Sequence, residues 1–280
     1  MTEEPPSPAD LVGVIPMAGQ GARINPLPMS KELFPVGFGK VPGASEPRPV
    51  PVCLHLLRQM RWAGVTRACL VLRPGKWDIP AYLQDGGSLG LALSYLVMPR
   101  DFGVPFTVNQ ATPFVGDCRV AFGFPDIILQ PDDVFSRLAE RQALTGADAV
   151  LAAYPTDEPS KWGVIGIDRE LNVYRVVEKP MGSDLRLAWA AAVWSPAFTR
   201  FLDFILSQWA PALQANRDEG GVDEMAFGDV LQAAIDAGLR IEAEIIRDGS
   251  ALDIGRPETL RAILGDPLER ARDHDKTGTT

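Results

Sequence analysis

Histidine and cysteine are scarce in this chain of 280 residues. Its two histidines, His55 and His274, lie in an apolar helical pattern and in a polar tail, and its three cysteines are far apart in the sequence. These features disfavour a histidine-based catalytic dyad, a zinc site and a disulfide framework. Cys53 and Cys69 lie in apolar runs, which predicts small residues of the core.

Positive charge is also in short supply, because 27 lysines and arginines face 36 aspartates and glutamates and leave a net charge of −9. Nucleic acid is therefore not expected as a partner, since its binding relies on a basic surface. A nucleotide substrate stays compatible with this charge, because a few local cations suffice for a small anion. The sequence contains no apolar run of the roughly 20 residues that span a membrane. The N-terminal MTEEPPSPAD lacks the basic and apolar regions of a signal peptide, so we predict a cytoplasmic protein with no membrane partner.

The segment 11–37, LVGVIPMAGQGARINPLPMSKELFPVG, leads from an apolar strand into a glycine-bearing turn and on to two cations. Glycine lets backbone N–H groups approach a phosphate closely, and Arg23 and Lys31 can neutralise what the turn holds. The segment lacks the P-loop pattern and the third glycine of a dinucleotide-binding fingerprint. It predicts a triphosphate site, with a plain strand-to-loop connection as the alternative.

Strands and helices alternate between two predicted flexible tails, 1–10 and 266–280. We expect helices at 50–63, 131–145, 195–209, 228–237 and 257–264. We expect strands at 11–17, 68–72, 91–97, 149–154, 190–194 and 239–246, an apolar run at 120–129, a hairpin over 164–178, a surface loop at 37–49 and a polar loop within 206–221. This alternation predicts an α/β fold with a mixed, mainly parallel sheet flanked by helices.

Short motifs follow one another in a fixed order: GQGAR at 19–23, SKELFPV at 30–36, FVGD at 114–117, PD at 125–126, WGVI at 162–165, VEKP at 177–180 and LDIGRP at 252–257. Together they resemble the motifs of sugar-1-phosphate nucleotidylyltransferases, of the glucose-1-phosphate thymidylyltransferase and uridylyltransferase type. The resemblance implies a Rossmann-like single domain over 11–265, with a nucleotide-binding part at 11–160, a sugar-binding part at 161–265 and a small β-hairpin on the sugar side.

The resemblance also implies a reaction, the Mg²⁺-dependent transfer of a nucleotidyl group from an NTP to a sugar 1-phosphate with release of pyrophosphate. The expected NTP is dTTP or UTP, the expected sugar is glucose 1-phosphate, and a homo-oligomer is expected. The attacking phosphate is already anionic, so catalysis is a matter of alignment and charge neutralisation and does not require histidine. A catalytically silent relative that binds nucleotide or nucleotide sugar and regulates a partner is the alternative.

The same resemblance assigns roles to individual residues. Arg23, Lys31 and Asp126 are catalytic, Ala18, Gly19 and Gly21 hold the nucleotide, Gly163, Glu178 and Lys179 hold the sugar phosphate, and Asp126 and Asp253 bind Mg²⁺. A few carboxylates, joined by phosphate oxygens and water, suit Mg²⁺. The structural alternatives are aspartates that cap turns, a solvated Arg-Lys pair in the loop, and a surface Glu-Lys pair on the hairpin.

Several positions depart from the family pattern. Ala18 and Ala22 stand where glycine and threonine are usual. In the stretch 98–106, Met98 takes the place of a glutamine and lacks the amide that would pair with a pyrimidine, so the choice of base stays open. Trp189 lies where the family has an Asn-Ala-Gly strand. It could narrow the sugar pocket, stack on a sugar ring or simply belong to the core.

Overall fold

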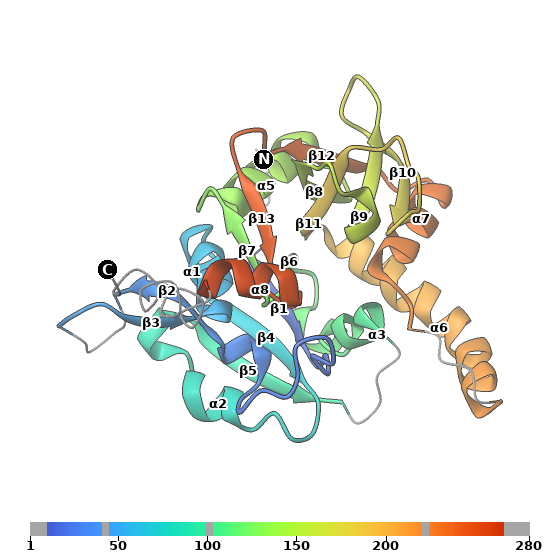
Figure 1. Cartoon of the computed structure of the whole chain (residues 1–280). Helices are drawn as coiled ribbons and strands as arrows, with labels where there is room; N and C mark the ends of the chain where they lie inside the picture. Colours follow the sequence, from blue (N-terminus) through green and yellow to red (C-terminus); the bar gives the residue numbers. More distant parts are fainter. Residues whose placement is uncertain (1–9, 41–44, 99–102, 220–223, 266–280) are drawn as a thin grey trace, which may run out of the picture.

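A mixed sheet of nine strands runs through the centre of the computed structural model, which describes residues 10–40, 45–98, 103–219 and 224–265 (Figure 1). One half of this sheet consists of parallel strands in the order β5-β4-β1-β6. Their bounds are β1 (Leu11–Met17), β4 (Arg67–Leu72), β5 (Ala92–Val97) and β6 (Arg119–Gly123). The carboxyl ends of these strands share one edge, which is where parallel α/β sheets bind ligands.

The other half of the sheet is organised around β11 (Leu187–Trp194), which runs antiparallel to β6 and to β8 (Ala149–Pro155). Beyond β8 lies β12 (Ile241–Ile245), parallel to it. The predicted hairpin is present as β9 (Gly163–Ile167) and β10 (Val173–Glu178), and β9 pairs with the start of β11. The α/β prediction is confirmed, with a sheet that is mixed and partly parallel.

The two faces of the sheet are covered by different helices because the residues of β1 alternate between them. Ile15 and Met17 face one core with α1 (Val52–Trp62) and α5 (Val134–Thr145). Val12 and Val14 face a second core with α3 (Val104–Asn109), α6 (Pro196–Asp218) and α7 (Phe227–Asp236). Burial on both faces explains why β1 reads as a continuous apolar run, as is typical of parallel strands.

The remaining helices are short or peripheral: α2 (Asp78–Leu83), α4 (Thr112–Val115) and α8 (Pro257–Leu264). Cys53 and Cys69 are buried, as predicted. None of the described helices has the length and apolar character needed to cross a membrane. Apart from Asp10, the tails predicted at 1–10 and 266–280 lie outside the described residues. The division into parts at residue 160 stays a prediction, although one sheet contains strands from both parts.

Two features differ from the expectation. Helix α6 extends to Asp218, so the end predicted at Trp209 is wrong; alanine, leucine and glutamine after Pro211 are good helix formers, and one proline removes one hydrogen bond without ending the helix. The loop expected at 37–49 is in part a small hairpin, β2 (Pro35–Gly39) with β3 (Arg48–Pro51).

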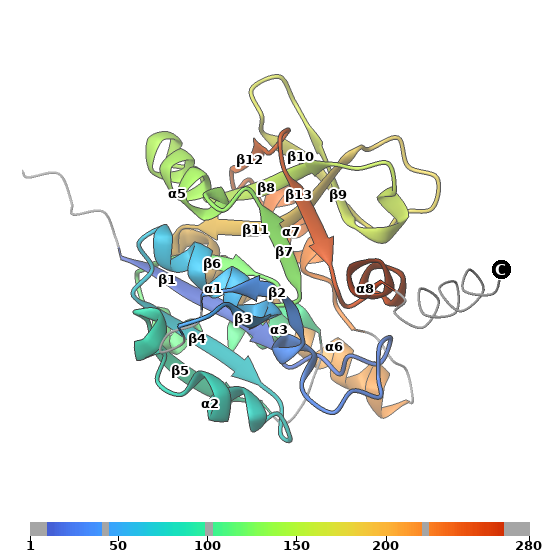
Figure 2. The same ribbon diagram turned by 60° about the vertical axis from the view of Figure 1, so that its left-hand side comes forward.

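The apolar run 120–129 is divided into β6 and β7 (Ile127–Gln130), with Asp126 between them. Strand β7 leaves the main sheet and pairs antiparallel with β13 (Ser250–Asp253), which the sequence analysis did not predict. Figure 2 shows these two strands side by side, with α8 following β13. The pairing joins segments separated by 120 residues.

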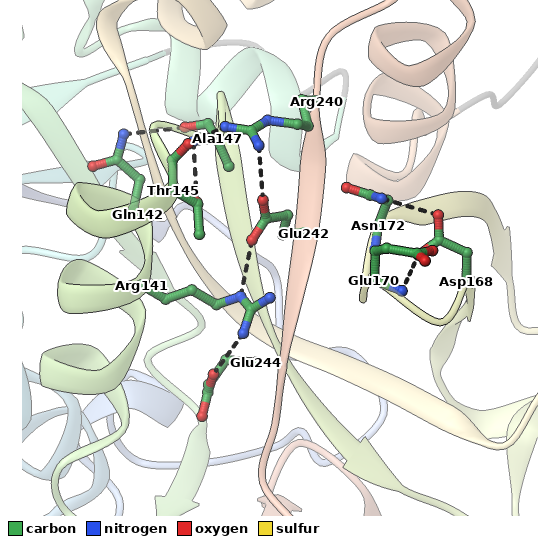
Figure 3. Close-up of polar contacts among 10 residues, drawn as sticks. All are labelled: Arg141, Gln142, Thr145, Ala147, Asp168, Glu170, Asn172, Arg240, Glu242 and Glu244. Carbon is green, nitrogen blue, oxygen red and sulfur yellow. Dashed lines mark hydrogen bonds and ion pairs between the residues drawn. The ribbon is translucent and has the colours of Figure 1, made fainter.

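Ion pairs cover the outer strand β12 (Figure 3). Arg141 of α5 lies 3.0 Å from Glu242 (Nε to Oε2) and 3.5 Å from Glu244 (Nη1 to Oε2). The other edge of β12 is covered by the turn between β9 and β10, through a β-bridge between Asn172 and Glu242.

Hydrogen bonds within the turn and to β12 hold the tip of the β9–β10 hairpin. Within the turn, Asp168 accepts hydrogen bonds from the backbone N–H of Glu170 and from the side-chain amide of Asn172, both at 2.9 Å (Figure 3). Across the gap to β12, the N–H of Ala243 donates to the carbonyl of Leu171 at 2.9 Å. The hairpin that carries Glu178 is therefore anchored at its far end.

Candidate active site

Two carboxylates from distant parts of the chain converge at the edge of the sheet. Asp126 precedes β7, Asp253 ends β13, and the N–H of Ile254 donates to the carbonyl of Asp126 at 3.0 Å. A Cβ on Gly255 would lie 2.8 Å from Oδ2 of Asp126 and 3.0 Å from Oδ1 of Asp253. The β7–β13 pairing thus places both carboxylates around one point.

The chemistry of this pair fits Mg²⁺. Among the described residues there is no group of three or more histidine, cysteine or carboxylate side chains that could enclose a metal ion. Mg²⁺ commonly binds one or two protein carboxylates and takes its other ligands from substrate phosphates and water. Asp126 and Asp253 are therefore the residues that would hold it.

Lys31 is paired with Asp126, with 2.5 Å between Nζ and Oδ2. Burial raises the pKa of Asp126, but the nearby Lys31 outweighs this and holds that pKa below its ordinary value. Burial likewise lowers the pKa of Lys31, but the carboxylates of Asp126 and Glu32 outweigh it and raise that pKa. Both groups are thus kept charged at this edge of the sheet.

Asp253 has two arginine neighbours. The sequence analysis predicted a role in the site for Arg23 but not for Arg256. Arg23 lies 3.9 Å away (Nη1 to Oδ2), and 57% of its side chain is exposed. Arg256 is buried and donates from Nε to the same Oδ2 at 2.7 Å. Its guanidinium also lies 5.3 Å from the ring centre of Trp162 and donates to the carbonyl of Lys161. Arg256 therefore ties Asp253 to the segment that carries Lys161 and Trp162. Its position in the LDIGRP motif is the signal that could have identified it.

A second buried ion pair lies beside Lys31 and was also missed. Glu32 is fully buried, and its Oε1 accepts from Nζ of Lys76 at 2.7 Å. Burial raises the pKa of Glu32 and lowers that of Lys76, each opposed by the partner's charge. Oε2 of Glu32 has no hydrogen-bond partner in the described parts of the chain. The two residues lie 44 positions apart in the sequence, so no local pattern predicts that they form an ion pair.

Glu178 ends β10 and accepts a hydrogen bond from the N–H of Gly228 at 3.1 Å, at the start of α7. Burial raises the pKa of Glu178, against the effects of Lys179 and of that N–H. A Cβ on Gly163 would lie 2.8 Å from Oε1 of Glu178 and 2.4 Å from Nε1 of Trp189, so only glycine fits beside this carboxylate. Glu178 is thus part of an internal wall and does not form a surface pair.

Lys179 is exposed and has a left-handed backbone, with φ of 43°. This conformation is strained for a residue other than glycine, and it is held by the hydrogen bond from its N–H to the carbonyl of Trp162, at 2.9 Å. Lys179 forms no ion pair with any residue that the structure describes. Its ammonium is therefore available to an anionic group.

One cavity of about 380 Å³ joins these groups. Seven of the residues predicted for the site line it: Arg23, Lys31, Asp126, Gly163, Glu178, Lys179 and Asp253. Ala18 and Gly19 line a smaller adjoining cavity that shares Lys31 and Asp126. Gly21, in a left-handed turn with φ of 67°, lines a third that shares Lys31. Lys31 is thus common to the three spaces, and the predicted residues form one continuous region.

The stretch proposed to read the base is only partly described, because residues 99–102 lie outside the described chain. Met98 itself is buried and packs against Ala18 and Val71. Met98 and Ala18, two of the departures from the family pattern, therefore belong to one small apolar cluster.

The sequence model described as nucleotidyl transferase matches residues 12–266. The chain belongs to this nucleotidyl transferase family. The match covers both the glycine turn and the segment that carries Asp253, so the predicted family is confirmed.

Curated relatives of this nucleotidyl transferase are distant. It is 25% identical over 252 residues to the low-salt glycan biosynthesis nucleotidyltransferase Agl11 of Haloferax volcanii. The matched region covers 89% of this chain and 63% of that protein. It is 27% identical over 173 residues to a glucose-1-phosphate thymidylyltransferase of Neisseria gonorrhoeae. That match covers 60% of this chain and 55% of the thymidylyltransferase. The chain thus spans less than two thirds of the length of these relatives.

Solved structures share the fold. A UDP-glucose pyrophosphorylase in complex with UDP-glucose superposes with a TM-score of 0.71 at 18% identity, covering 93% of this chain and 99% of the other. The UTP-bound UGPase of Acinetobacter baumannii gives 0.68 at 16% identity, covering 97% and 100%. The nucleotidyl transferase therefore has the same architecture as proteins seen with a nucleotide or a nucleotide sugar.

Gly255 provides a first test of the proposed metal site. We expect Gly255→Ala to raise the Mg²⁺ concentration needed for half-maximal activity by about 10–100-fold, because the new Cβ displaces both carboxylates. The measurement is a Mg²⁺ titration of pyrophosphate release. Gly87→Ala is the control, since Gly87 is exposed and its new Cβ would lie 3.1 Å from the exposed Asp85 side chain. Equal Mg²⁺ requirements in the two variants would contradict the assignment.

Proposed function

We propose that this chain transfers a nucleotidyl group from an NTP to a sugar 1-phosphate and releases pyrophosphate. The observation that carries the proposal is the convergence of Asp126 and Asp253 beside Lys31, in the same cavity as Glu178 and Lys179. Carboxylates for a divalent cation and cations for phosphates thus line the same cavity as a carboxylate and a lysine for a sugar phosphate.

In this mechanism an oxygen of the sugar phosphate attacks the α-phosphorus of the NTP, and the bond to the pyrophosphate breaks. Lys31 and Arg23 neutralise the triphosphate and the leaving pyrophosphate, Arg with a planar fork and Lys as a point charge. Asp126 and Asp253 would hold Mg²⁺, which supplies further positive charge to the phosphate oxygens. Lys179 pairs with the sugar phosphate, and Glu178 accepts hydrogen bonds from sugar hydroxyls.

The charge of the cavity supports anionic substrates. The chain as a whole has a net charge of −9. The cavity nevertheless has five basic residues (Arg23, Lys31, Lys161, Lys179 and Arg256) against four acidic ones (Asp126, Glu178, Glu224 and Asp253). This local surplus of positive charge offsets the repulsion between two phosphorylated substrates. That repulsion is the main electrostatic obstacle to phosphoryl transfer.

For the substrates we propose dTTP or UTP with glucose 1-phosphate. The support is the sequence likeness to a glucose-1-phosphate thymidylyltransferase and the shared fold with UDP-glucose pyrophosphorylase. A homo-oligomer is proposed on the family resemblance alone. The alternative of a silent regulatory relative is disfavoured by the two converging carboxylates, since a protein that only binds nucleotide does not need them.

The test is a substrate matrix. The protein is incubated with Mg²⁺, each of four NTPs and each of several sugar 1-phosphates, and pyrophosphate release is measured. We expect release with dTTP or UTP and glucose 1-phosphate, and its loss when Mg²⁺ is removed with EDTA. Absence of release in every combination would overturn the proposal, and calorimetry would then establish whether nucleotide binds without turnover.

A further inference from the structure

Arg256 is a buried arginine that joins two segments 95 positions apart in the sequence. Its Nε donates to Oδ2 of Asp253 at 2.7 Å, and its Nη2 donates to the carbonyl of Lys161. Its guanidinium also lies 5.3 Å from the ring centre of Trp162. Asp253 ends β13, which pairs with β7 in a sheet of two strands, and Trp162 directly precedes β9 of the main sheet. One side chain therefore links the two sheets.

The first contact of Arg256 fixes the direction of the Asp253 carboxylate. Oδ1 of Asp253 accepts from the N–H of Gly255 at 2.9 Å, and Oδ2 accepts from Arg256. Each oxygen keeps a second acceptor position for a cation. The other arginine beside Asp253, Arg23, lies 3.9 Å from Oδ2 with 57% of its side chain exposed, against 11% for Arg256. Arg256 is thus the more firmly held of the two.

The second contact of Arg256 leads to Lys179. The carbonyl of Trp162 accepts from the N–H of Lys179 at 2.9 Å. Lys179 has a left-handed backbone with φ of 43°, which persists only where the surrounding structure holds it. The position of Trp162 therefore bears directly on the position of Lys179. A continuous path of contacts leads from Asp253 through Arg256 and Trp162 to Lys179.

The burial of Arg256 indicates more than charge balance. Taking a guanidinium out of water is unfavourable unless good geometry and further hydrogen bonds offset the loss. Arg256 has an acceptor on each of the two segments, and its planar fork fixes both directions at once. The two segments also meet through Lys161 and Glu258, 3.8 Å apart, but these side chains are 35% and 58% exposed. Exposed pairs of this kind contribute little.

We propose that Arg256 is a positioning residue that sets the placement of Asp253 relative to Lys179. Asp253 would hold Mg²⁺ beside the NTP, and Lys179 pairs with the sugar phosphate. The two substrates react only when they are aligned, and a misplacement of about 1 Å can lower the rate by about 10²-fold. The inference rests on the proposed function, because it takes the roles of Asp253 and Lys179 from it.

The test uses three variants. Arg256→Ala removes the link and keeps the backbone. Arg256→Lys keeps the positive charge but has no planar fork, so it tests orientation even if Arg256→Ala does not fold. The matched control is Glu258→Gln, because Glu258 forms the exposed contact between the same two segments. Thermal unfolding establishes whether each variant is folded.

We expect Arg256→Ala to raise the Mg²⁺ concentration for half-maximal pyrophosphate release by about 10–100-fold, because Asp253 loses its orientation. The KM for glucose 1-phosphate should rise by about tenfold, because Lys179 is displaced. Arg256→Lys should show the rise in KM as well, and Glu258→Gln should show neither change. Full recovery of both values in Arg256→Lys, or no change in Arg256→Ala, would overturn the inference.

A small cation should replace the lost side chain. Arg256 lines both the cavity of about 380 Å³ and an adjoining one of about 340 Å³, so the space vacated in Arg256→Ala opens to both. Ethylguanidinium should raise pyrophosphate release by this variant about tenfold, a part of what a partner of a metal ligand contributes. Ethylammonium at the same concentration should not, because it has no planar fork. Equal rescue by the two cations would reduce Arg256 to a charge and overturn the inference.

Hydrogen exchange separates this inference from the proposed function, because it needs neither metal nor turnover. The amide of Lys179 should exchange about tenfold faster in Arg256→Ala than in the unmodified protein, while the amides of β1 keep their rates. Turnover with unchanged exchange at Lys179 would overturn the inference and keep the proposed function. Faster exchange at Lys179 in a protein without turnover would keep the link and overturn the proposed function.

Discussion

Replacing Asp126 by asparagine will lower kcat by about 10²–10³-fold, the range seen when one preorganised electrostatic group is lost from an active site. The amide keeps the shape of the side chain but removes the negative charge that faces Lys31 at 2.5 Å and that would hold Mg²⁺. The measurement is pyrophosphate release at saturating NTP, sugar 1-phosphate and Mg²⁺. Circular dichroism and thermal unfolding establish that the variant is folded.

The control for this variant is Asp117→Asn. Asp117 lies in the same region of the chain, but its side chain is 92% exposed, and its one ion pair within the described chain is with the exposed Arg200 at 3.1 Å. Its kcat should stay within about twofold of the original, because exposed ion pairs contribute little. If Asp126→Asn keeps more than a tenth of the activity, Asp126 is not a metal ligand.

Replacing Lys76 by methionine will lower the free energy of unfolding by about 3–5 kcal/mol, the usual cost of removing one partner from a buried ion pair. Glu32 would be left fully buried without its cation, and its Oε2 already lacks a partner in the described chain. Denaturant unfolding measures the loss. Arg200→Met, which breaks an exposed pair, should cost no more than about 1 kcal/mol.

The stability deficit of Lys76→Met should also depend on pH. Burial already raises the pKa of Glu32 above its ordinary value of 4.5, and loss of Lys76 raises it further. The folded variant then holds a proton that the unfolded chain releases, so its stability falls as pH rises from about 4.5 through the raised pKa. The double variant Glu32→Leu/Lys76→Met should regain most of the stability, because an apolar pair of similar size can replace a buried ion pair. A deficit that is constant with pH, or a double variant as unstable as the single one, would contradict this account.

Local sequence patterns predicted the elements whose signals are local. Strand β1 matches its predicted bounds because an uninterrupted apolar run suits a strand buried on both faces. Helix α5 ends at Thr145, before Gly146 in a left-handed conformation, as the glycine indicated. Helix α6 shows the limit of this approach, since the polar residues after Trp209 read as a loop although their helix propensity is high.

The sequence by itself determined the family, the α/β class and the residue types available for phosphate and metal chemistry, because these depend on the order of short motifs. Only the tertiary structure decided how they meet. Pairing of β7 with β13 brings Asp253 to Asp126, and burial places Lys76 against Glu32. The same packing places the indole N–H of Trp189 against the carboxylate of Glu178, beside Gly163. Such contacts link residues far apart in sequence, and their free energy comes from burial and pairing in the folded state, which local patterns do not encode.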